Sequence, residues 1–272
     1  MSYSNTALIR RLERNALARW YQEKPAATRL RQQIERDLAP LLDDWFGYHM
    51  VIAGIDMGMD FSQMSRVQHI TRLIPDYLAA PESTPAVVGS EGELPFASES
   101  IDALVLIHAF DGESDAHPIL REAQRVLTAR GQLLIVNINR LGGLGIWRNL
   151  RHRVFSRFKN PWRIPSPRQL EDWLQLLDFS VARARHKLVL PVDGEGRIGR
   201  WLAKFDDMLV GWNTPLGSVY LLHATKIVRG HLQTPVSSAV RRPLMGLPVS
   251  KPAAGAQGQV SPRQPPSLRV VE

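Results

Sequence analysis

The stretch LPFASESIDALVLIHAFDGESDAHPILREAQRVLTARGQLLIVNIN, from Leu94 to Asn139, has the pattern of a strand, a helix and a second strand. Apolar residues dominate Ser100–Ile107 after its polar start, and they dominate Gln132–Ile138 as well. Continuous apolar runs of this length are typical of strands buried on both faces of a sheet. The segment between them predicts a helix, because apolar residues recur there at helical spacing: Ile119, Leu120, Ala123, Val126 and Leu127.

The ends of this helix can also be predicted from the residues. Ser114 or Asp115 can supply the N-cap, Pro118 is tolerated in the first turn, and Gly131 is predicted to end the helix. Two buried strands joined by a crossover helix form a βαβ unit, which is right-handed almost without exception. The chain is therefore predicted to be built around an open parallel sheet.

The composition bounds the class of protein. With 272 residues, 44% of them hydrophobic, the chain can bury a full core as one domain with additions. It contains no cysteine, which excludes disulfides, thiolate metal sites and cysteine nucleophiles, and we expect no metal site. The apolar runs are too short to cross a bilayer, and the first residues lack the apolar core of a secretory signal. We therefore expect a cytoplasmic protein without a transmembrane segment.

Three regions differ in their patterns. Residues 1–47 are predicted to form a helical segment, residues 48–230 an α/β domain, and residues 231–272 a disordered, Pro-rich basic tail. The formal net charge of +8 is concentrated locally, because Arg140–Arg163 holds seven Lys or Arg and no Asp or Glu. This run lies in a basic aromatic insertion, residues 140–165, which together with the tail makes an anionic partner plausible.

The opening stretch resembles the second half of a class I S-adenosylmethionine-dependent methyltransferase domain, of the methyltransferase type 11 kind. The resemblance rests on the LPF turn, on the strand SIDALVLIHAF and on the helix and strand HPILREAQRVLTARGQLLIVN. A closing pattern from DWLQLLDF to GSVYLLHATK resembles the end of the same domain. The resemblance implies a Rossmann-like, mostly parallel seven-stranded sheet with helices on both faces and an antiparallel edge hairpin.

The resemblance also implies S-adenosylmethionine as the cofactor. Gly54 aligns with the first glycine of the family's acid-x-Gly-x-Gly-x-Gly motif, so Gly54, Ile55 and Asp56 are expected near the amino-acid end of the cofactor. The motif is degenerate here, because no acid lies two residues before Gly54 and Gly58 comes too late for the second glycine. Gly54→Val is expected to abolish cofactor binding while the protein stays folded.

The other expected contacts follow the next strands. Asp76, after the second strand His69–Ile74, is the nearest candidate for the acid that holds the ribose hydroxyls in the family. Ser90, Glu91 and Leu94 are expected near adenine. His108 is expected beneath the sulfonium, and it has two interpretations: an imidazole facing the cofactor or the acceptor and able to shuttle a proton, or a polar strand-end residue with a backbone partner.

The sequence therefore predicts a methyltransferase acting on an unknown acceptor, with a small molecule favoured. No catalytic residue is assigned, because methyl transfer of this kind is mainly positioning of an activated donor against a nucleophile. One alternative is a catalytically inactive, methyltransferase-like protein that binds a partner through the basic aromatic insertion. A second alternative is a nucleic-acid methyltransferase, which the location of the positive charge favours.

Overall fold

A computed structural model describes residues 2–75, 85–111, 115–143, 145–146, 164–182, 184–187 and 217–227. The chain divides into two units, Met1–Arg229 and Gly230–Glu272, and every described residue belongs to the first. The predictions for Asp76, for Ser114, for most of the basic aromatic insertion and for the tail fall outside the described residues.

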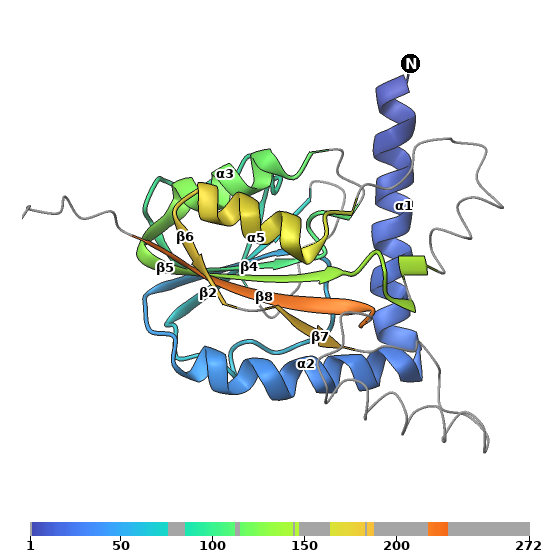
Figure 1. Ribbon diagram of the computed structural model, residues 1–272, viewed down its shortest axis with the longest axis horizontal. Helices are drawn as coiled ribbons and strands as arrows, with labels where there is room; N and C mark the ends of the chain where they lie inside the picture. The colour runs from blue at the N-terminus through green and yellow to red at the C-terminus, as the bar shows by residue number, and fades with distance from the viewer. Residues whose placement is uncertain are drawn as a thin grey trace, which may run out of the picture. The chain divides into compact units, whose positions relative to one another are not determined.

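A mostly parallel sheet forms the centre of the first unit (Figure 1). Its strands are β1 (His49–Gly54), β2 (His69–Ile74), β3 (Ala86–Val88), β4 (Ile101–Ile107), β5 (Leu127–Ile138), β6 (Phe179–Val181), β7 (Arg185–Lys187) and β8 (Val219–Lys226). The spatial order is β3-β2-β1-β4-β5-β8-β6; the first five strands are parallel, and β8 runs antiparallel to β5.

The two short strands β6 and β7 both pair with β8. Because β5 already occupies one edge of β8 along Val219–Thr225, β6 and β7 lie on its other edge and together fill one position of the sheet. The sheet therefore has seven positions with an antiparallel edge, which confirms the fold predicted from the sequence.

Helices cover both faces of this sheet, as predicted (Figure 1). α1 (Ser2–Glu23) and α2 (Pro25–Asp43) precede β1, and α2 buries Ile34, Leu38 and Leu42 against one face. α3 (His117–Val126) and α5 (Pro167–Leu176) cover the opposite face with Leu120, Leu170 and other apolar residues. The core is thus two apolar layers, one on each side of the strands.

The boundary between α3 and β5 differs from the prediction. Gly131 does not end the helix: α3 ends at Val126, and β5 begins at Leu127 and runs through Gly131. The pairing of β4 with β5 shifts register between Ile101 and Ala103, and Arg130 has a φ of 66°. The residues of β5 between Leu127, which pairs with Ile101, and Gln132, which pairs with Ala103, form an irregularity in the strand. Gly131 therefore belongs to a β-bulge-like feature and not to a helix cap.

Candidate functional site

The carboxyl ends of β1, β3 and β4 lie at one edge of the sheet, because all three strands are parallel. β1 pairs directly with β4, and β2 connects β1 to β3. In open α/β sheets this edge is where ligands bind. Gly54 ends β1, Ser90 follows β3, and His108 follows β4 directly. The structure therefore places candidate residues from three strands at the same edge.

Gly54 allows β1 and β4 to approach closely at this edge. Its φ is 114°, and a Cβ at this position would lie 1.8 Å from the carbonyl oxygen of Ile107. The amide of Ile55 donates a hydrogen bond to the same oxygen at 3.0 Å. A side chain at residue 54 would break this contact, so Gly54→Val is expected to disrupt the fold itself, contrary to the expectation from the sequence.

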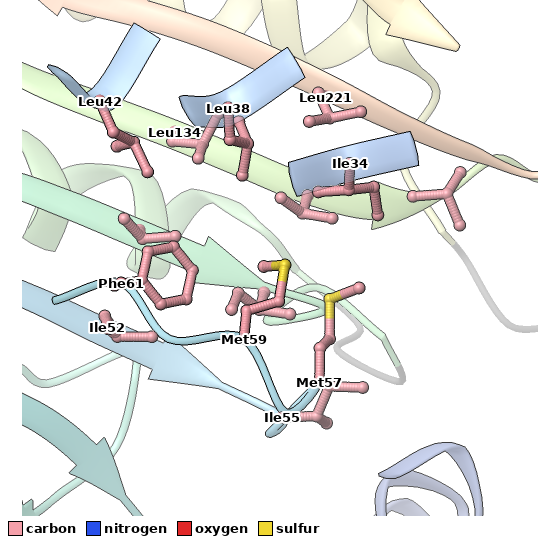
Figure 2. Close-up of a cluster of buried hydrophobic side chains, with 14 of the residues drawn as sticks. Ile34, Leu38, Leu42, Ile52, Ile55, Met57, Met59, Phe61, Leu134 and Leu221 are labelled. Carbon is pink, nitrogen blue, oxygen red and sulfur yellow. The ribbon is translucent and has the colours of Figure 1, made fainter. Parts of the chain in front are cut away.

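The segment after β1 has no regular secondary structure, and its residues alternate in exposure. Ile55, Met57, Met59 and Phe61 are buried, whereas Asp56, Gly58 and Asp60 between them are exposed. Figure 2 shows these apolar side chains among Ile34, Leu38 and Leu42 of α2. In the described segment 55–68 no helix follows β1. A ligand at this end of the site therefore meets loop amides and not the N-terminus of a helix.

Asp56 already contacts a backbone amide and a guanidinium group in this region. Its Oδ1 accepts a hydrogen bond from the amide of Gly58 at 2.8 Å and lies 3.1 Å from Nη1 of Arg72 on β2. Gly58 has a φ of 71°, which a glycine adopts without strain. Asp56 is half exposed, so its carboxylate can also be reached from solvent.

The residues that follow β3 contact the N-terminal helix α1. Ser90 is exposed, and its Oγ accepts a hydrogen bond from the amide of Gly92 at 3.3 Å. The Glu91 carboxylate forms an ion pair with Arg14 of α1, and both side chains are only 12% exposed. Glu91, expected to lie near adenine, thus has a cationic partner 77 residues away in sequence.

Leu94 opens the LPF turn, which two charged residues of α3 hold in place. Glu122 Oε2 accepts from the amide of Leu94 at 2.9 Å, and Arg125 donates to the carbonyl oxygens of Leu94 and Phe96 at 3.0 and 2.9 Å. Hydrogen bonds from Arg125 to Glu122 are the main reason that the pKa of the Glu122 carboxyl lies below its ordinary value. The Glu and Arg of the LREAQRV motif therefore shape the turn on which Leu94 lies.

His108 is fully buried at the end of β4. Its φ is 51°, its amide donates to the carbonyl of Val136 at 2.8 Å, and its Nε2 lies 2.9 Å from the hydroxyl of Tyr21 on α1. Its Nδ1 lies 3.5 Å from Oδ2 of Asp111. The Nδ1 atom has no hydrogen-bond partner among the described residues, and the donor and acceptor roles in the Tyr21 contact depend on the tautomer of the ring. His108 thus has the backbone partner of one interpretation, and its imidazole contacts Tyr21 and Asp111. A role of this imidazole toward a cofactor or an acceptor stays a prediction.

Further polar groups lie buried near the ends of β5 and β8. The Nδ2 of Asn137 donates to the Tyr220 hydroxyl at 3.4 Å, and that hydroxyl donates to the carbonyl of Pro165 at 3.3 Å. Burial raises the pKa of Tyr220, and the nearby charge of Asp111 raises it further. The Oδ1 of Asn137 is buried and has no hydrogen-bond partner among the described residues. Buried polar atoms of this kind often mark a ligand or water position.

Tyr21, Asn137 and Tyr220 are members of this region that were not predicted from the sequence. Asn137 carried a detectable signal, because it is the polar residue within the apolar run Leu133–Ile138 of β5. Tyr220 did not stand out, since β8 also contains His223, Thr225 and Lys226. Tyr21 carried no signal, since nothing in residues 1–47 indicates that α1 reaches the end of β4. The described residues contain no group of three or more His, Cys, Asp or Glu that could hold a metal ion. Among them, no helix is long and apolar enough to cross a membrane.

Comparisons with known proteins find similar sequences and similar folds. The sequence model of a family described as "Methyltransferase domain" matches residues 45–135. The chain is 30% identical over 167 residues to the uncharacterized Escherichia coli (strain K12) protein YafS, covering 61% of this chain and 67% of that protein.

Solved structures share the fold at low sequence identity. A chain of the complex that contains the Haloferax volcanii Trm112 methyltransferase activator aligns with a TM-score of 0.57 and 15% identity, over 82% of this chain and 99% of that one. An S-adenosylmethionine-dependent methyltransferase from Thermotoga maritima aligns with a TM-score of 0.54 and 18% identity, over 78% and 95%. One from Mesorhizobium loti gives 0.51 and 10% identity, over 76% and 100%.

Proposed function

We propose that this chain, which belongs to the class I S-adenosylmethionine-dependent methyltransferase family, binds S-adenosylmethionine at the carboxyl edge of its sheet and methylates a small-molecule acceptor. The observation that carries the proposal is the meeting of Gly54, the Ser90–Leu94 turn and His108 at the ends of three parallel strands. This is the edge at which open α/β sheets bind ligands.

The residues present fit the adenosine part of the cofactor better than its amino-acid part. Leu94 offers an apolar wall and Glu91 a carboxylate that can accept from the adenine amino group. At the other end, Asp56 offers a carboxylate for the α-ammonium group. The amide of Ile55 is already bonded to Ile107, and the loop after it has no helix N-terminus. We therefore expect binding that is weaker than a full glycine motif would give.

The cofactor supplies an activated methyl group on its sulfonium, so the protein's own residues have to bind, orient and exclude water. His108 is the titratable group at the end of β4 that could hold a proton released by the acceptor. The carboxylate of Asp111 faces its Nδ1 and would stabilise the imidazolium that forms.

Asp56 provides a test at an exposed position of the loop. Asp56→Asn removes the charge facing the α-ammonium group, and we expect the affinity for S-adenosylhomocysteine to fall about tenfold, measured by calorimetry. Asp60→Asn is the matched control, because Asp60 is an exposed carboxylate of the same loop that accepts hydrogen bonds from Ser62 and from the amide of Gln63. Equal affinities in the two variants would contradict the assignment of Asp56.

A second candidate is a methyltransferase-like protein that has lost the cofactor and binds a partner. The specific observation in its favour is the buried segment Ile55–Phe61, which replaces a glycine loop and helix with apolar side chains in the core. This candidate predicts no cofactor affinity at all. It also predicts a partner that is lost when Arg148, Arg151 and Arg153 are changed to Glu.

The nucleic-acid methyltransferase alternative rests on charge alone, because the basic aromatic insertion lies mostly outside the described residues. It predicts binding to non-specific duplex DNA or RNA with a steep salt dependence. The absence of such binding at low salt would remove it.

A further inference from the structure

One face of α1 carries the residues that attach this helix to the sheet edge. Arg14, Leu17 and Tyr21 are spaced by three and four positions, so they lie on the same side of the helix. Leu17 and Tyr21 are buried in the core layer beneath the sheet, and Arg14 is largely buried in its ion pair. Figure 1 shows α1 beside the ends of β4 and β5.

The polar contacts of this face involve two of the candidate cofactor residues. Arg14 pairs with Glu91, and the Tyr21 hydroxyl bonds to Nε2 of His108 at 2.9 Å. These contacts join α1 to the ends of two different strands, β3 and β4. They are shielded from water, because Tyr21 is 2% exposed and His108 is fully buried. The Glu91 carboxylate and Nε2 of His108, which a ligand at this edge would contact, are thus already paired with α1.

We propose that α1 is a closing element of the cofactor site, and that its Arg14–Glu91 and Tyr21–His108 contacts compete with the cofactor. This inference rests on the proposed function, since it concerns how the same site is reached. Glu91 and His108 can contact a ligand only after their contacts with Arg14 and Tyr21 are broken. Cofactor binding therefore requires α1 to move. Because only open molecules bind, the apparent affinity is the intrinsic affinity multiplied by the fraction of molecules that are open.

Removing one contact should shift this balance toward the open state. A buried hydrogen bond or ion pair of this kind is typically worth about 1 kcal/mol, which corresponds to roughly a fivefold change in an equilibrium constant. Arg14→Gln and Tyr21→Phe should therefore each raise the affinity for S-adenosylhomocysteine by about fivefold, and the double variant should raise it further.

The experiment is a calorimetric titration of the full chain and these three variants with S-adenosylhomocysteine. Arg66→Gln is the control, because Arg66 forms an exposed ion pair with Asp43 away from this edge. Tighter binding in the α1 variants, with the control unchanged, supports the inference. Unchanged or weaker binding in those variants overturns it while the proposed function stands. No binding by any variant overturns the proposed function and the inference together.

A second measurement follows the helix directly. Because the chain has no cysteine, Ala16→Cys on α1 and Gln175→Cys on α5 would carry a single pair of spin labels at two exposed positions. Saturating S-adenosylhomocysteine should shift or broaden the distance distribution between the labels, because α1 has to leave Glu91 and His108. A distribution that stays unchanged while ligand is bound contradicts the inference.

Discussion

A single glycine sets the geometry at the centre of the candidate site. The sequence indicates a turn that starts at Gly54, but it does not reveal that residue 54, the last residue of β1, faces the backbone of Ile107 from another strand. Such a contact depends on which strands become neighbours. The alignment of motifs therefore suggested a ligand role, whereas the structure first assigns Gly54 a packing role.

Gly54→Ala tests this packing role. A Cβ 1.8 Å from a carbonyl oxygen and a positive φ both oppose the substitution, so we expect a loss of about 3 kcal/mol or more in the free energy of unfolding. Gly92→Ala is the matched control, since its nearest neighbour would lie 3.8 Å away, and it should change stability by less than about 0.5 kcal/mol. Urea denaturation of both variants measures the difference, and a stable Gly54→Ala protein would refute the packing role.

His223 on β8 should make stability depend on pH. Burial lowers the pKa of its imidazole, the charge of Arg185 lowers it further, and its Nε2 lies 2.8 Å from Oε1 of Gln132. Because the folded-state pKa lies below that of the unfolded chain, the unfolded state binds more protons, and stability falls as the pH decreases below about 6.5.

The measurement is the urea midpoint of the wild type and of His223→Gln between pH 7.5 and pH 5. The variant should lose part of the decrease toward low pH, because glutamine does not titrate. The same dependence in both proteins would show that His223 does not contribute.

At the scale of elements, the apolar pattern predicted most strands well. β2 matches its predicted bounds, and β4 begins one residue after its predicted start. The error at Gly131 has a physical cause: Leu127 fits the helical spacing of α3, yet it is equally buried as the first residue of β5. Spacing alone does not separate these two possibilities for a residue at the junction.

The LPF turn depends on Arg125 of α3, which bonds to two carbonyl oxygens of the turn and to Glu122. Arg125→Met should lower the free energy of unfolding by about 2 kcal/mol, because several hydrogen bonds are lost together. Arg121→Met, on an exposed position of the same helix, is the control and should have little effect. Equal stabilities of the two variants would mean that Arg125 does not hold the turn.

The connection between β1 and β2 is the element that sequence patterns described least well. Ile55, Met57, Met59 and Phe61 alternate with exposed residues, as in a strand, but they pack in the layer beneath α2 without joining the sheet (Figure 2). Only the position of α2 explains why this alternation is stable, because α2 covers the other side of these side chains. That position could not be inferred from the loop itself.

At the scale of the molecule, the fold could be predicted because the sequence patterns that indicate it each lie within a short stretch of the chain. One strand–helix–strand stretch and a closing strand pattern define a parallel sheet with an antiparallel edge, and the structure has this arrangement. The site is less predictable, because it is assembled from segments far apart in sequence. The bond between Tyr21 and His108 joins residues 87 positions apart, and no pattern within either segment indicates it.

The central claim is that this sheet edge still binds the methyltransferase cofactor despite the degenerate glycine motif. The most direct measurement is calorimetric titration of the full chain with S-adenosylmethionine and with S-adenosylhomocysteine. Binding of both, with dissociation constants on the order of micromolar to tens of micromolar, is the predicted result. No heat and no thermal shift at millimolar concentrations of either compound would contradict the claim and favour the partner-binding alternative.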